Sequence, residues 1–586
     1  MGEHQGKRSG AGGPVGHPAT QPMGYSEAGR WRPRQALRLA LAVFVAKLVR
    51  WLTRVLNRGH GGTSLPGRIV LSLAPDAILL WMQQLRRGVV VVTGTNGKTS
   101  TANLIRLFLR RQGYRVVANA SGANLLGGVA TALALATDPW GRLRSADYAV
   151  IEADERISER IVAAAGVKAR ALVVTNILRD QLDRLAEPEL VRQAIGRAAS
   201  RLPATARLLL NADDPGVVQL ATSNLADSPV SSDSSDRRAP SSATTVFYGL
   251  GEVTTDRPGA TAGLPRAEAA MPGGEAASVD TEVRDSETCP ACGSQLSFAL
   301  RFYSHLGFYE CPVCGWRRPE PAWTADATLV RCEPGDDPGW AVAVHVPDHT
   351  EPVRGVLPGE AAATASASLP DSVRVKLAAA GVHQLYNLLA AVATVAELTG
   401  RLPLQAGEII RPQVFGRMEK VALGAEWGHR ELVLALTKNP TGANQNLRTL
   451  AGDQRVRSVM FVLNDLAADG RDISWIWDVD WSPVVARTDW TLVATGRRAA
   501  EAALCWHYAG VATERIQVQP SLETAMRTAV ESIPPGSRCL ALATYTGLLQ
   551  FRHLLATRHW VSWYWEQDDQ TDPEQDSGLL SPLTSM

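Results

Sequence analysis

Four short, almost continuously apolar runs mark the first half of the chain. They span Arg87–Thr93, Asp147–Ala153, Ala171–Ile177 and Arg207–Asn211. Runs of this length are typical of strands that are buried on both faces. Helical patterns separate them, one at about Thr99–Gln112, and this alternation predicts a parallel sheet with helices on both faces. A helix from about His383 to Leu398 is expected to close this α/β domain.

A second alternating set occupies the C-terminal part of the chain. Its predicted strands are Glu431–Leu436, Ser458–Leu463, Thr491–Ala494, Ile516–Gln519 and Cys539–Ala543. Its predicted helices are Ala499–Tyr508, Leu522–Glu531 and Thr546–Leu555. This pattern predicts a smaller, doubly wound domain of the Rossmann-like type. The predicted fold class is therefore α/β, with two parallel sheets in two domains.

An interrupted apolar stretch, Leu37–Leu56, precedes the first strand. It contains four basic residues: Arg38, Lys47, Arg50 and Arg54. Its longest uncharged run, Leu39–Ala46, is far shorter than the ~20 residues that cross a bilayer, so an amphipathic helix is predicted. Two roles are open for this helix. It packs on the following domain, or it rests on an anionic membrane surface, for which Trp51 and the basic residues are suited.

Composition changes along the chain define its predicted segments. The first 30 residues contain Gly, Pro and His without an apolar core, which predicts a disordered leader rather than a secretory signal. The residues after Gln567 are polar and predict a flexible tail. The predicted segments are the leader 1–30, the amphipathic helix 31–60, a first domain 61–400 with a cysteine-rich insert at about 286–320, a second domain 401–565, and the tail 566–586.

The overall composition narrows the class of protein. The chain has 586 residues, of which 45% are hydrophobic, so two or three domains with sizeable cores are expected. The formal net charge of +2 gives no reason to expect a nucleic-acid partner. Seven cysteines are too few for a disulfide scaffold in so long a chain. Without a secretory signal, this usage predicts a cytoplasmic protein.

A glycine-containing loop, Val91–Ser100, joins the first strand to the following helix. Such a loop turns backbone N–H groups toward phosphate oxygens at a helix N-terminus. Lys98 is expected to reach the β- and γ-phosphates, and the Thr99 hydroxyl to hold Mg²⁺. Val92 stands where the general P-loop pattern has glycine, so an ordinary glycine-rich turn is the alternative. The candidate nucleotide-binding residues of the loop are Gly94, Thr95, Asn96, Gly97, Lys98, Thr99 and Ser100.

Acidic residues end the second strand, in the run Ile151–Glu155. The carboxyl ends of parallel strands meet at the ligand-binding edge of a sheet, so these acids are expected near the phosphate loop. Glu152 is the first choice as a Mg²⁺ ligand. A solvated acidic turn is the alternative.

Four of the cysteines form two C-x-x-C pairs, Cys289 with Cys292 and Cys311 with Cys314. The pairs are separated by 18 residues, which is the spacing of a zinc ribbon. Each pair lies on a Cys-Pro-x-Cys-Gly turn, which lets two thiolates converge on a tetrahedral ion. The sequence predicts a structural Zn²⁺ site, and a redox dithiol is the alternative.

Several motifs resemble those of the Mur ligase superfamily, and they occur in the same order. They are Thr93–Thr99, Thr175–Ile177, Leu210–Pro215, Gly381–Asn387 and Phe415–Glu419. That family uses a shorter glycine spacing than most P-loops, in agreement with Val92. Two further runs, Lys438–Gly442 and Leu463–Asp478, resemble the MurT-type subunit of lipid II isoglutaminyl synthase, as does the four-cysteine insert. The resemblance covers roughly Gly62–Leu555.

The resemblance implies a fold and a reaction. The first domain is similar to the Mur-ligase-type central ATP-binding domain with an inserted zinc ribbon, and the second to its smaller Rossmann-like partner. Members of the family transfer the γ-phosphate of ATP to a carboxylate, with Mg²⁺, and nitrogen then displaces phosphate. For the MurT type, the carboxylate is the α-carboxyl of D-glutamate in lipid II. The implied product carries D-isoglutamine and serves peptidoglycan synthesis.

The resemblance also implies a partner and further site residues. Ammonia is delivered by a GatD-type class I glutamine amidotransferase subunit in a heterodimer. If the N-terminal helix rests on a membrane, the protein is expected at the inner face of the plasma membrane. Asn387, Arg417 and Lys438 are expected to approach the nucleotide across the domain cleft. An aspartate of the Asp-Gly-Arg-Asp run orients the partner's catalytic histidine, which places that role on Asp472. Cys505 lacks the strand–turn–helix elbow of a glutaminase nucleophile, so this chain alone should not hydrolyse glutamine.

The chain departs from the family pattern in three respects. Arg179 and Asp180 stand where many Mur ligases have a histidine shortly after the Thr-Asn strand. The modified lysine that holds a second metal has no counterpart, so a second Mg²⁺ is not expected. A nucleotide-sugar-binding domain is not expected either, which suits a lipid-linked substrate. The alternative functions are a folylpolyglutamate-type or stem-peptide ligase that adds an amino acid, and a nucleotide-binding scaffold without chemistry.

Overall fold

The computed structural model describes residues 33–56, 64–120, 122–143, 145–179, 188–222, 242–255, 285–332, 338–347, 370–379, 381–412, 416–561 and 580–581. The predicted leader, 1–30, lies outside these residues, and so does the predicted tail apart from Leu580 and Ser581. These two residues form strand β19, which pairs antiparallel with Ile409–Ile410. An edge strand offers unpaired backbone groups, and these two residues of the predicted tail pair with them.

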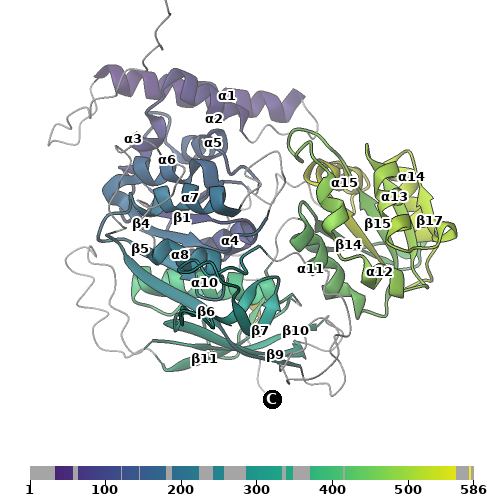
Figure 1. The fold of residues 1–586 in the computed structure, drawn as a ribbon. Helices are drawn as coiled ribbons and strands as arrows, with labels where there is room; N and C mark the ends of the chain where they lie inside the picture. Colours follow the sequence, from purple (N-terminus) through teal and green to yellow (C-terminus); the bar gives the residue numbers. More distant parts are fainter. Residues whose placement is uncertain are drawn as a thin grey trace, which may run out of the picture.

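The larger of two α/β units is built on an 11-stranded sheet, in the order β19-β12-β11-β10-β9-β6-β5-β4-β1-β3-β2 (Figure 1). Its parallel strands are β1 (Gly88–Thr93), β2 (Val116–Ala118), β3 (Tyr148–Glu152), β4 (Ala169–Val174), β5 (Arg207–Asn211), β6 (Thr244–Thr255) and β9 (Trp323–Arg331). The sheet continues through β10 (Pro338–His345), β11 (Ser372–Leu377), β12 (Ile409–Ile410) and β19 (Leu580–Ser581). This is the first unit.

Helices cover both faces of the parallel part, as the uniformly apolar strands predict. Val90 and Val92 of β1 face one core, and Val89 and Val91 face the other. The first core is covered by α4 (Lys98–Arg111) and by α10 (Val382–Thr399), which ends at the left-handed Gly400. The helices on the other side are α2 (Leu65–Leu73), α3 (Ala77–Met82), α5 (Leu126–Ala136), α6 (Glu155–Ala165), α7 (Pro188–Ala199) and α8 (Pro215–Thr222), with the short η1 (Gly166–Lys168).

The predicted N-terminal helix is α1 (Pro33–Leu56), and it packs on α2 and α5. One of its faces is fully buried at Leu39, Ala42, Val43 and Ala46. Lys47 Nζ donates a hydrogen bond to Thr137 O at 2.7 Å and fixes the helix to the unit. In the part of the chain that the structure describes, no helix is both long enough and apolar enough to cross a membrane.

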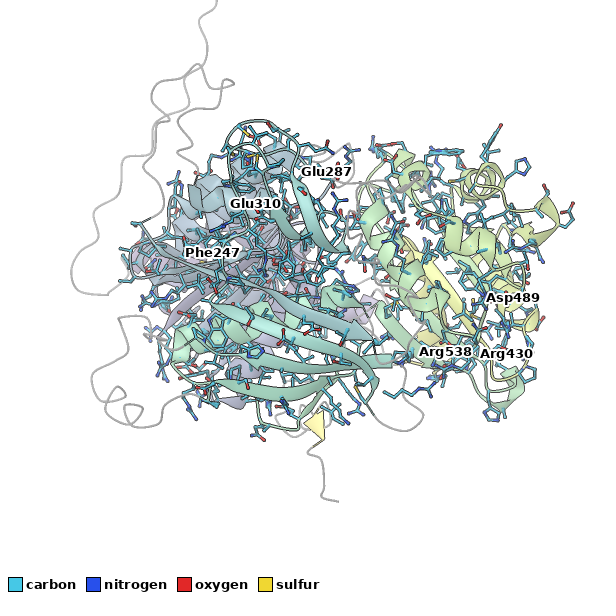
Figure 2. The ribbon with its side chains drawn as sticks, turned by 60° about the horizontal axis from the view of Figure 1, so that its bottom comes forward. Phe247, Glu287, Glu310, Arg430, Asp489 and Arg538 are labelled. Atoms are coloured by element: carbon cyan, nitrogen blue, oxygen red, sulfur yellow. The ribbon has the colours of Figure 1, made fainter. Side chains whose placement is uncertain are left out.

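Strands β9, β10 and β11 form an antiparallel extension that the sequence interpretation did not contain. Buried and partly buried positions alternate along β10, although its residues Trp340–Val344 form a continuous apolar run that is a strand signal in the sequence. Between β6 and β9, a hairpin of β7 (Ser297–Tyr303) and β8 (Leu306–Glu310) forms a separate 2-stranded sheet. This hairpin carries the four clustered cysteines near one end of the first unit, beside Glu287 and Glu310 (Figure 2).

The second unit has a six-stranded sheet in the order β13-β14-β18-β15-β16-β17. The strands are β13 (Arg417–Ala422), β14 (Glu431–Leu436), β15 (Val456–Val462), β16 (Thr491–Thr495), β17 (Ile516–Val518) and β18 (Arg538–Ala543). The helices are α11 (Pro440–Ala451), α12 (Ser482–Ala486), α13 (Ala499–Tyr508), α14 (Leu522–Glu531) and α15 (Tyr545–Thr557), with short turns η4 (Ala425–Trp427), η5 (Ser474–Asp478) and η6 (Thr513–Arg515). All neighbouring strands are parallel except β13 and β14.

The sequence pattern predicted this unit closely because its central strands are buried on both faces. β14, α13 and α14 begin and end at the predicted residues. A buried guanidinium, Arg538, ties two strands together by pairing with Glu431 and with Asp453, the latter at 2.6 Å (Figure 2). The edge strand β13 was not predicted.

Candidate nucleotide-binding site

The predicted phosphate loop runs from Gly94 to Gly97, between β1 and α4. Both glycines have positive φ values, 117° and 86°, which favour glycine. A Cβ on Gly94 would lie 2.4 Å from Thr175 Oγ1, and one on Gly97 would lie 2.3 Å from Asn387 Oδ1. The loop therefore has room for backbone only. By helix geometry, the first N–H groups of α4 have no partner within the helix, so they can bind an anion.

The residues that follow β4 hold the loop in place. Asn176 O accepts a hydrogen bond from Thr95 N at 2.9 Å, and Asn176 Oδ1 accepts one from Asn96 N at 2.9 Å. Asn176 Nδ2 and Thr175 Oγ1 both donate to Asn96 O, at 3.1 and 2.7 Å. β4 lies beside β1 in the sheet, so the two strand ends meet here. The Thr175–Ile177 motif therefore has a positioning role that the sequence interpretation did not assign.

Replacing Gly94 by alanine is expected to destabilise the fold by about 1–3 kcal/mol and to weaken nucleotide binding. The new Cβ would meet Asn176 backbone atoms at 2.8 and 3.0 Å, which cannot move without shifting β4. Gly113→Ala is the matched control, because Gly113 also has a positive φ, 89°, but has nothing within 4 Å of its Cβ position. Thermal unfolding and calorimetric titration with ATP measure both effects. Equal losses in the two variants would contradict the crowding argument.

Lys98 begins α4 and lies over the loop with its side chain buried. Its Nζ donates to Gly94 O, to Thr95 O at 3.2 Å and to Glu155 Oε1 at 2.7 Å. Glu155 is the first residue of α6, whose N-terminus Asp154 caps by accepting from Arg156 N. In this arrangement the Glu155 carboxylate is the anion that pairs with the Lys98 ammonium group. From the sequence alone, Glu152 is the preferred acid of this run, and nothing there assigns a role to Glu155.

Glu152 ends β3 and lies buried beside the loop. The Asn119 side chain clamps its backbone, since Asn119 Oδ1 accepts from Glu152 N and Asn119 Nδ2 donates to Glu152 O, both at 2.9 Å. The Thr99 hydroxyl hydrogen-bonds the Glu152 carboxyl. Burial raises the pKa of this carboxyl, and the cations of Lys98, Arg417 and Lys438 oppose the rise. The two predicted Mg²⁺ ligands are thus in contact.

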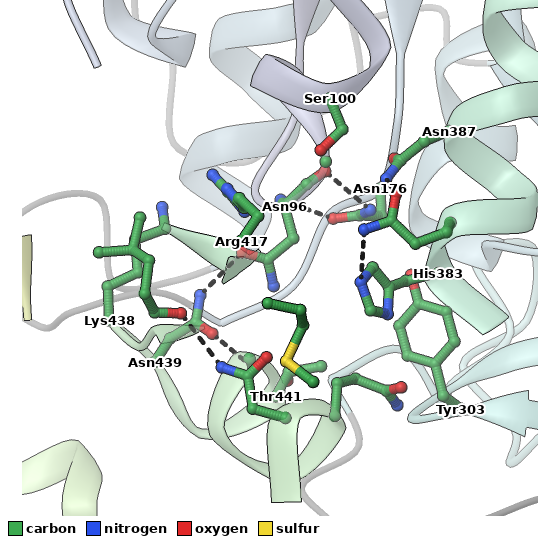
Figure 3. A pocket seen from close by; sticks show the side chains of 17 residues that line it. Asn96, Ser100, Asn176, Tyr303, His383, Asn387, Arg417, Lys438, Asn439 and Thr441 are labelled. Carbon is green, nitrogen blue, oxygen red and sulfur yellow. Dashed lines mark hydrogen bonds between the residues drawn. The ribbon is translucent and has the colours of Figure 1, made fainter. Parts of the chain in front are cut away.

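The second unit completes the site from the opposite side (Figure 3). Lys438 Nζ donates to Thr95 O at 3.4 Å, and Asn439 Nδ2 donates to Asn96 Oδ1 at 3.3 Å. Asn439 also caps α11 by accepting from Gly442 N at 2.8 Å, which fixes its direction. The pocket between the units is lined by Asn96, Gly97, Ser100, Asn176, Tyr303, His383, Gln384, Asn387, Arg417, Met418, Leu436, Lys438, Asn439, Thr441, Gly442, Gln445 and Asn446.

Helix α10 supplies a polar wall of this pocket. Asn387 accepts a hydrogen bond from Thr101 Oγ1 at 3.3 Å and donates one to Gln384 Oε1 at 3.1 Å. Burial and the nearby Arg417 guanidinium lower the pKa of His383 to about 4, so its imidazole is neutral at pH 7. His383 lies in the quoted Gly381–Asn387 motif, which is the signal by which the sequence interpretation could have included it.

These residues fit a nucleoside triphosphate with a divalent cation. The predicted site residues converge on one location. They are the residues of the loop together with Glu152, Asn387, Arg417 and Lys438. The helix N-terminus, Lys98, Arg417 and Lys438 offer positive charge to phosphates, and the Glu152 carboxylate with the Thr99 hydroxyl offers oxygen ligands that suit Mg²⁺. Beside them lies a pocket lined mainly by polar side chains, with room for further parts of a ligand.

The four predicted cysteine ligands also converge. Their sulfur atoms all lie within 4.8 Å of one another, and two sulfur pairs lie at 3.5 Å, Cys289 with Cys314 and Cys292 with Cys311. Zn–S bonds of about 2.3 Å in a tetrahedron place sulfurs ~3.8 Å apart, so the cluster has the size of a zinc site. All seven cysteines of the chain are free of disulfides.

The cysteine-bearing hairpin is tied to the back of the nucleotide site through Asp213 and Asp214. Asp213 Oδ1 accepts from Arg318 Nε at 2.6 Å, and Asp213 Oδ2 accepts from Tyr386 OH at 2.6 Å. His305 Nε2 lies 3.2 Å from Asp214 Oδ1, and the other oxygen of Asp214 accepts from Ile177 N at 2.8 Å. Tyr386 and Ile177 directly adjoin Asn387 and Asn176, two residues that line the pocket.

Asp472 does not line the pocket. It lies at the surface of the second unit, where Oδ1 accepts from Ser474 N at 2.9 Å and Oδ2 accepts from Ser474 Oγ at 3.0 Å, at the start of η5. Trp475 and Trp481 of the same run are buried in the core of the unit, whereas Trp477 is 51% exposed and lies against Tyr508. The segment around Asp472 is therefore a capped loop that covers buried tryptophans. It also forms a surface with exposed aromatic side chains.

Comparison with known proteins identifies two matching family descriptions, similar curated proteins and a solved structure with a similar fold. The family description "Mur ligase middle domain" matches residues 92–246, and "MurT ligase C-terminal" matches residues 436–548. The MurT subunit of lipid II isoglutaminyl synthase (glutamine-hydrolyzing) from Streptococcus pneumoniae is 30% identical over 86% of this chain and 95% of its own length. The corresponding Staphylococcus aureus subunit is 28% identical over 78% of this chain and 85% of its own. A pseudomurein peptide ligase type C from Methanothermus fervidus has a similar fold, with a TM-score of 0.50 and 18% identity over 83% of this chain and 81% of its own.

Proposed function

Because the chain belongs to the MurT subunit family of lipid II isoglutaminyl synthases, which are Mur ligases, we propose that it amidates the D-glutamate α-carboxyl of lipid II with ATP. The observation that carries this proposal is the convergence of Lys98, Glu152, Arg417 and Lys438, from both units, on one phosphate loop. A site that surrounds a triphosphate with cations and holds one metal-ligating carboxylate is suited to phosphoryl transfer.

The proposed reaction has two steps. A carboxylate oxygen of the substrate attacks the γ-phosphorus, a P–O bond breaks and ADP leaves, which forms an acyl phosphate. Ammonia then attacks the carbonyl carbon, a C–N bond forms, the C–O bond to phosphate breaks, and inorganic phosphate leaves with loss of one proton from nitrogen. Activation is needed because a free carboxylate has no good leaving group. The protein's part is to position the reactants and to neutralise charge.

Each charged residue has a proposed role in these steps. Lys98 contacts the transferred phosphoryl group, and in doing so exchanges Glu155 for phosphate oxygens. Thr99 and Glu152 would hold Mg²⁺, which would withdraw charge from the phosphates when bound. Lys438 and Arg417 contribute charge from the second unit, and Asn387 orients the nucleotide from α10. ATP and Mg²⁺ are the corresponding cofactors.

The proposed nitrogen source is a GatD-type glutaminase subunit that docks on the second unit. The support is the position of Asp472 at a surface, with exposed Trp477 in η5 and exposed Tyr508 at the end of α13. Each oxygen of this carboxylate can accept a second hydrogen bond besides the one from Ser474, so it can meet the histidine of a partner and fix its tautomer, as in a catalytic triad. Because lipid II is membrane-linked, the heterodimer would work at the inner face of the plasma membrane.

We also assign a structural Zn²⁺ to the four cysteines, as a zinc ribbon. Four sulfur ligands would close the coordination shell and leave no position for chemistry. The positive φ values of Gly293 and Gly315, 74° and 73°, support the assignment, because each allows a tight turn directly after a C-x-x-C pair. Cys289 N and Cys311 N donate to Ser294 O and Trp316 O, so the two turns have matching hydrogen bonds.

Removing this metal is expected to destabilise the first unit. Replacing Cys292 and Cys314 together by serine should abolish bound zinc, measured by atomic absorption, and lower the melting temperature by several degrees. It should also weaken ATP binding several-fold, because the hairpin supports Asp213 and Asp214 behind the site. Cys505→Ser is the matched control, since Cys505 packs within the second unit. Unchanged zinc content in the double variant would overturn the assignment.

Mass spectrometry of lipid II tests the proposed function directly. The full chain is incubated with lipid II, Mg-ATP and ammonium, and separately with a GatD-type subunit and glutamine. Conversion of one carboxyl to an amide, with release of ADP, is the expected result in at least one condition. Conversion in neither, with amino-acid addition when amino acids are supplied, would replace the proposal by the amino-acid-adding alternative. ADP release without any lipid II product would also contradict it.

A further inference from the structure

The outward face of α1 is a continuous apolar stripe. Its members recur at helical spacing and are all at least partly exposed: Leu37, Leu41, Phe44, Leu48, Trp51 and Leu52. The exposed fractions of Leu37, Phe44 and Trp51 are 72%, 63% and 59%. The helix needs none of these side chains for its own attachment, because a different face packs on α2 and α5. A contiguous exposed patch of this kind marks an interaction surface.

The charges on α1 identify the chemistry of the surface it fits. The 24 residues Pro33–Leu56 contain no Asp or Glu, but they contain five basic residues, of which Lys47 is bound to Thr137 O. Arg38 directly follows Leu37, is exposed, and therefore lies at the side of the stripe. Apolar side chains flanked by cations, with a tryptophan between them, are the pattern of helices that lie in the interface of an anionic bilayer.

The position of α1 in the molecule agrees with such contact. α1 runs along the outer edge of the first unit, and the second unit lies to one side (Figure 1). The neighbouring loop adds a second aromatic side chain and another cation. A Cβ on Gly141 would lie 3.3 Å from Leu39 Cγ, so this loop adjoins α1, and its Trp140 is 70% exposed beside the exposed Arg142.

We propose that the Leu37–Leu52 stripe of α1, with Trp140 beside it, binds flat on an anionic lipid bilayer. The stripe enters the boundary between headgroups and acyl chains, while the exposed Arg38 and Arg142 contact the phosphates of lipid headgroups. At about 1.5 Å per residue, α1 is ~36 Å long, so the contact would fix the orientation of the first unit to the surface. The inference concerns α1 rather than the ligase site, and its test needs neither ATP nor lipid II.

Vesicle sedimentation of the full chain provides the test. We expect binding to vesicles of equimolar phosphatidylglycerol and phosphatidylcholine, weaker binding to phosphatidylcholine alone, and weakening by salt. The double variant Phe44→Gln/Leu48→Gln should lose at least about tenfold in its partition coefficient. The matched control is Leu190→Gln/Val518→Gln, which replaces two exposed apolar side chains, 43% and 52% exposed, on other elements. It should bind as the unchanged chain does.

Several outcomes would overturn the proposal. They are failure of the unchanged chain to bind anionic vesicles, equal binding by the stripe variant, and a dimer in sedimentation velocity that the stripe variant lacks, which would make the stripe an interface between copies. Amidation of detergent-solubilised lipid II is measured in parallel and should be unaffected by the stripe variant. Absence of amidation in every protein, with intact vesicle binding, would count against the proposed function and leave the lipid contact standing.

Discussion

Replacing Lys98 by alanine is expected to lower ammonia-dependent amidation of lipid II by on the order of a thousandfold in kcat. Lys98 Nζ is the cation at the phosphate loop that the first unit itself supplies, and it is held there by loop carbonyls. Its positive charge stabilises the transition state most during phosphoryl transfer, because negative charge then spreads over phosphate oxygens in a site shielded from water. Mass spectrometry of lipid II over time, with ADP release, measures the loss.

The control must separate catalysis from folding. Lys98→Ala leaves Glu155, which is largely buried, without its 2.7 Å cationic partner, and breaking a buried pair costs about 3–5 kcal/mol. The double variant Lys98→Ala/Glu155→Ala removes that unpaired charge and should regain stability but not activity. Lys168→Ala, in the short turn after α6, should change neither. Recovery of amidation in the double variant would show that Lys98 acts through stability alone.

The second large effect is expected for Asp472→Asn, which should reduce glutamine-dependent amidation by about a hundredfold or more while leaving ammonia-dependent amidation unchanged. Asp472 is not among the residues that line the nucleotide pocket, so the ligase step should not sense the change. Asparagine is nearly isosteric and can still accept from Ser474 N, so the start of η5 should persist. The lost charge is the one proposed to orient the partner's histidine.

Both nitrogen sources are assayed with the assembled heterodimer, so that weakened docking is seen as a shifted dependence on partner concentration. Asp478→Asn is the matched control, because Asp478 is an exposed acid of the same run. It should leave both reactions intact. If Asp472→Asn lowers both reactions equally, or if Asp478→Asn has the same selective effect, the assignment to Asp472 is wrong.

Continuous burial explains which parts of the fold the sequence could predict. β1, β3, β4 and β5 are buried on both faces, so their apolar runs are unbroken and their positions were predicted within a few residues. β10 also contains a continuous apolar run, Trp340–Val344, but every second position of it is only partly buried, and it is not among the predicted strands. Two opposite faces of α1 are apolar, one packed against the protein and one turned outward. Which of the two faces is buried depends on packing, so the amino-acid composition of the helix cannot show it.

The site shows the same limit at the level of single residues. The loop itself was identifiable, because Gly94, Gly97 and Lys98 are fixed by local geometry. Glu152 and Glu155 are three positions apart, and only the structure shows that Asn119 clamps the first while the second pairs with Lys98. His305 and Asp214 are separated by 91 positions, so their contact has no local signal.

The two hydrogen bonds by which Lys438 and Asn439 reach Thr95 and Asn96 have a consequence for inhibitor discovery. Both units line the pocket, Asn387 from α10 of the first and Lys438 from the second, so a compound that contacts both side chains binds only when the two sheets lie in this arrangement. Its measured affinity then includes the fraction of molecules already in that arrangement. Screening against a fragment that contains one sheet would miss this contribution and would select different compounds from a screen against the whole chain.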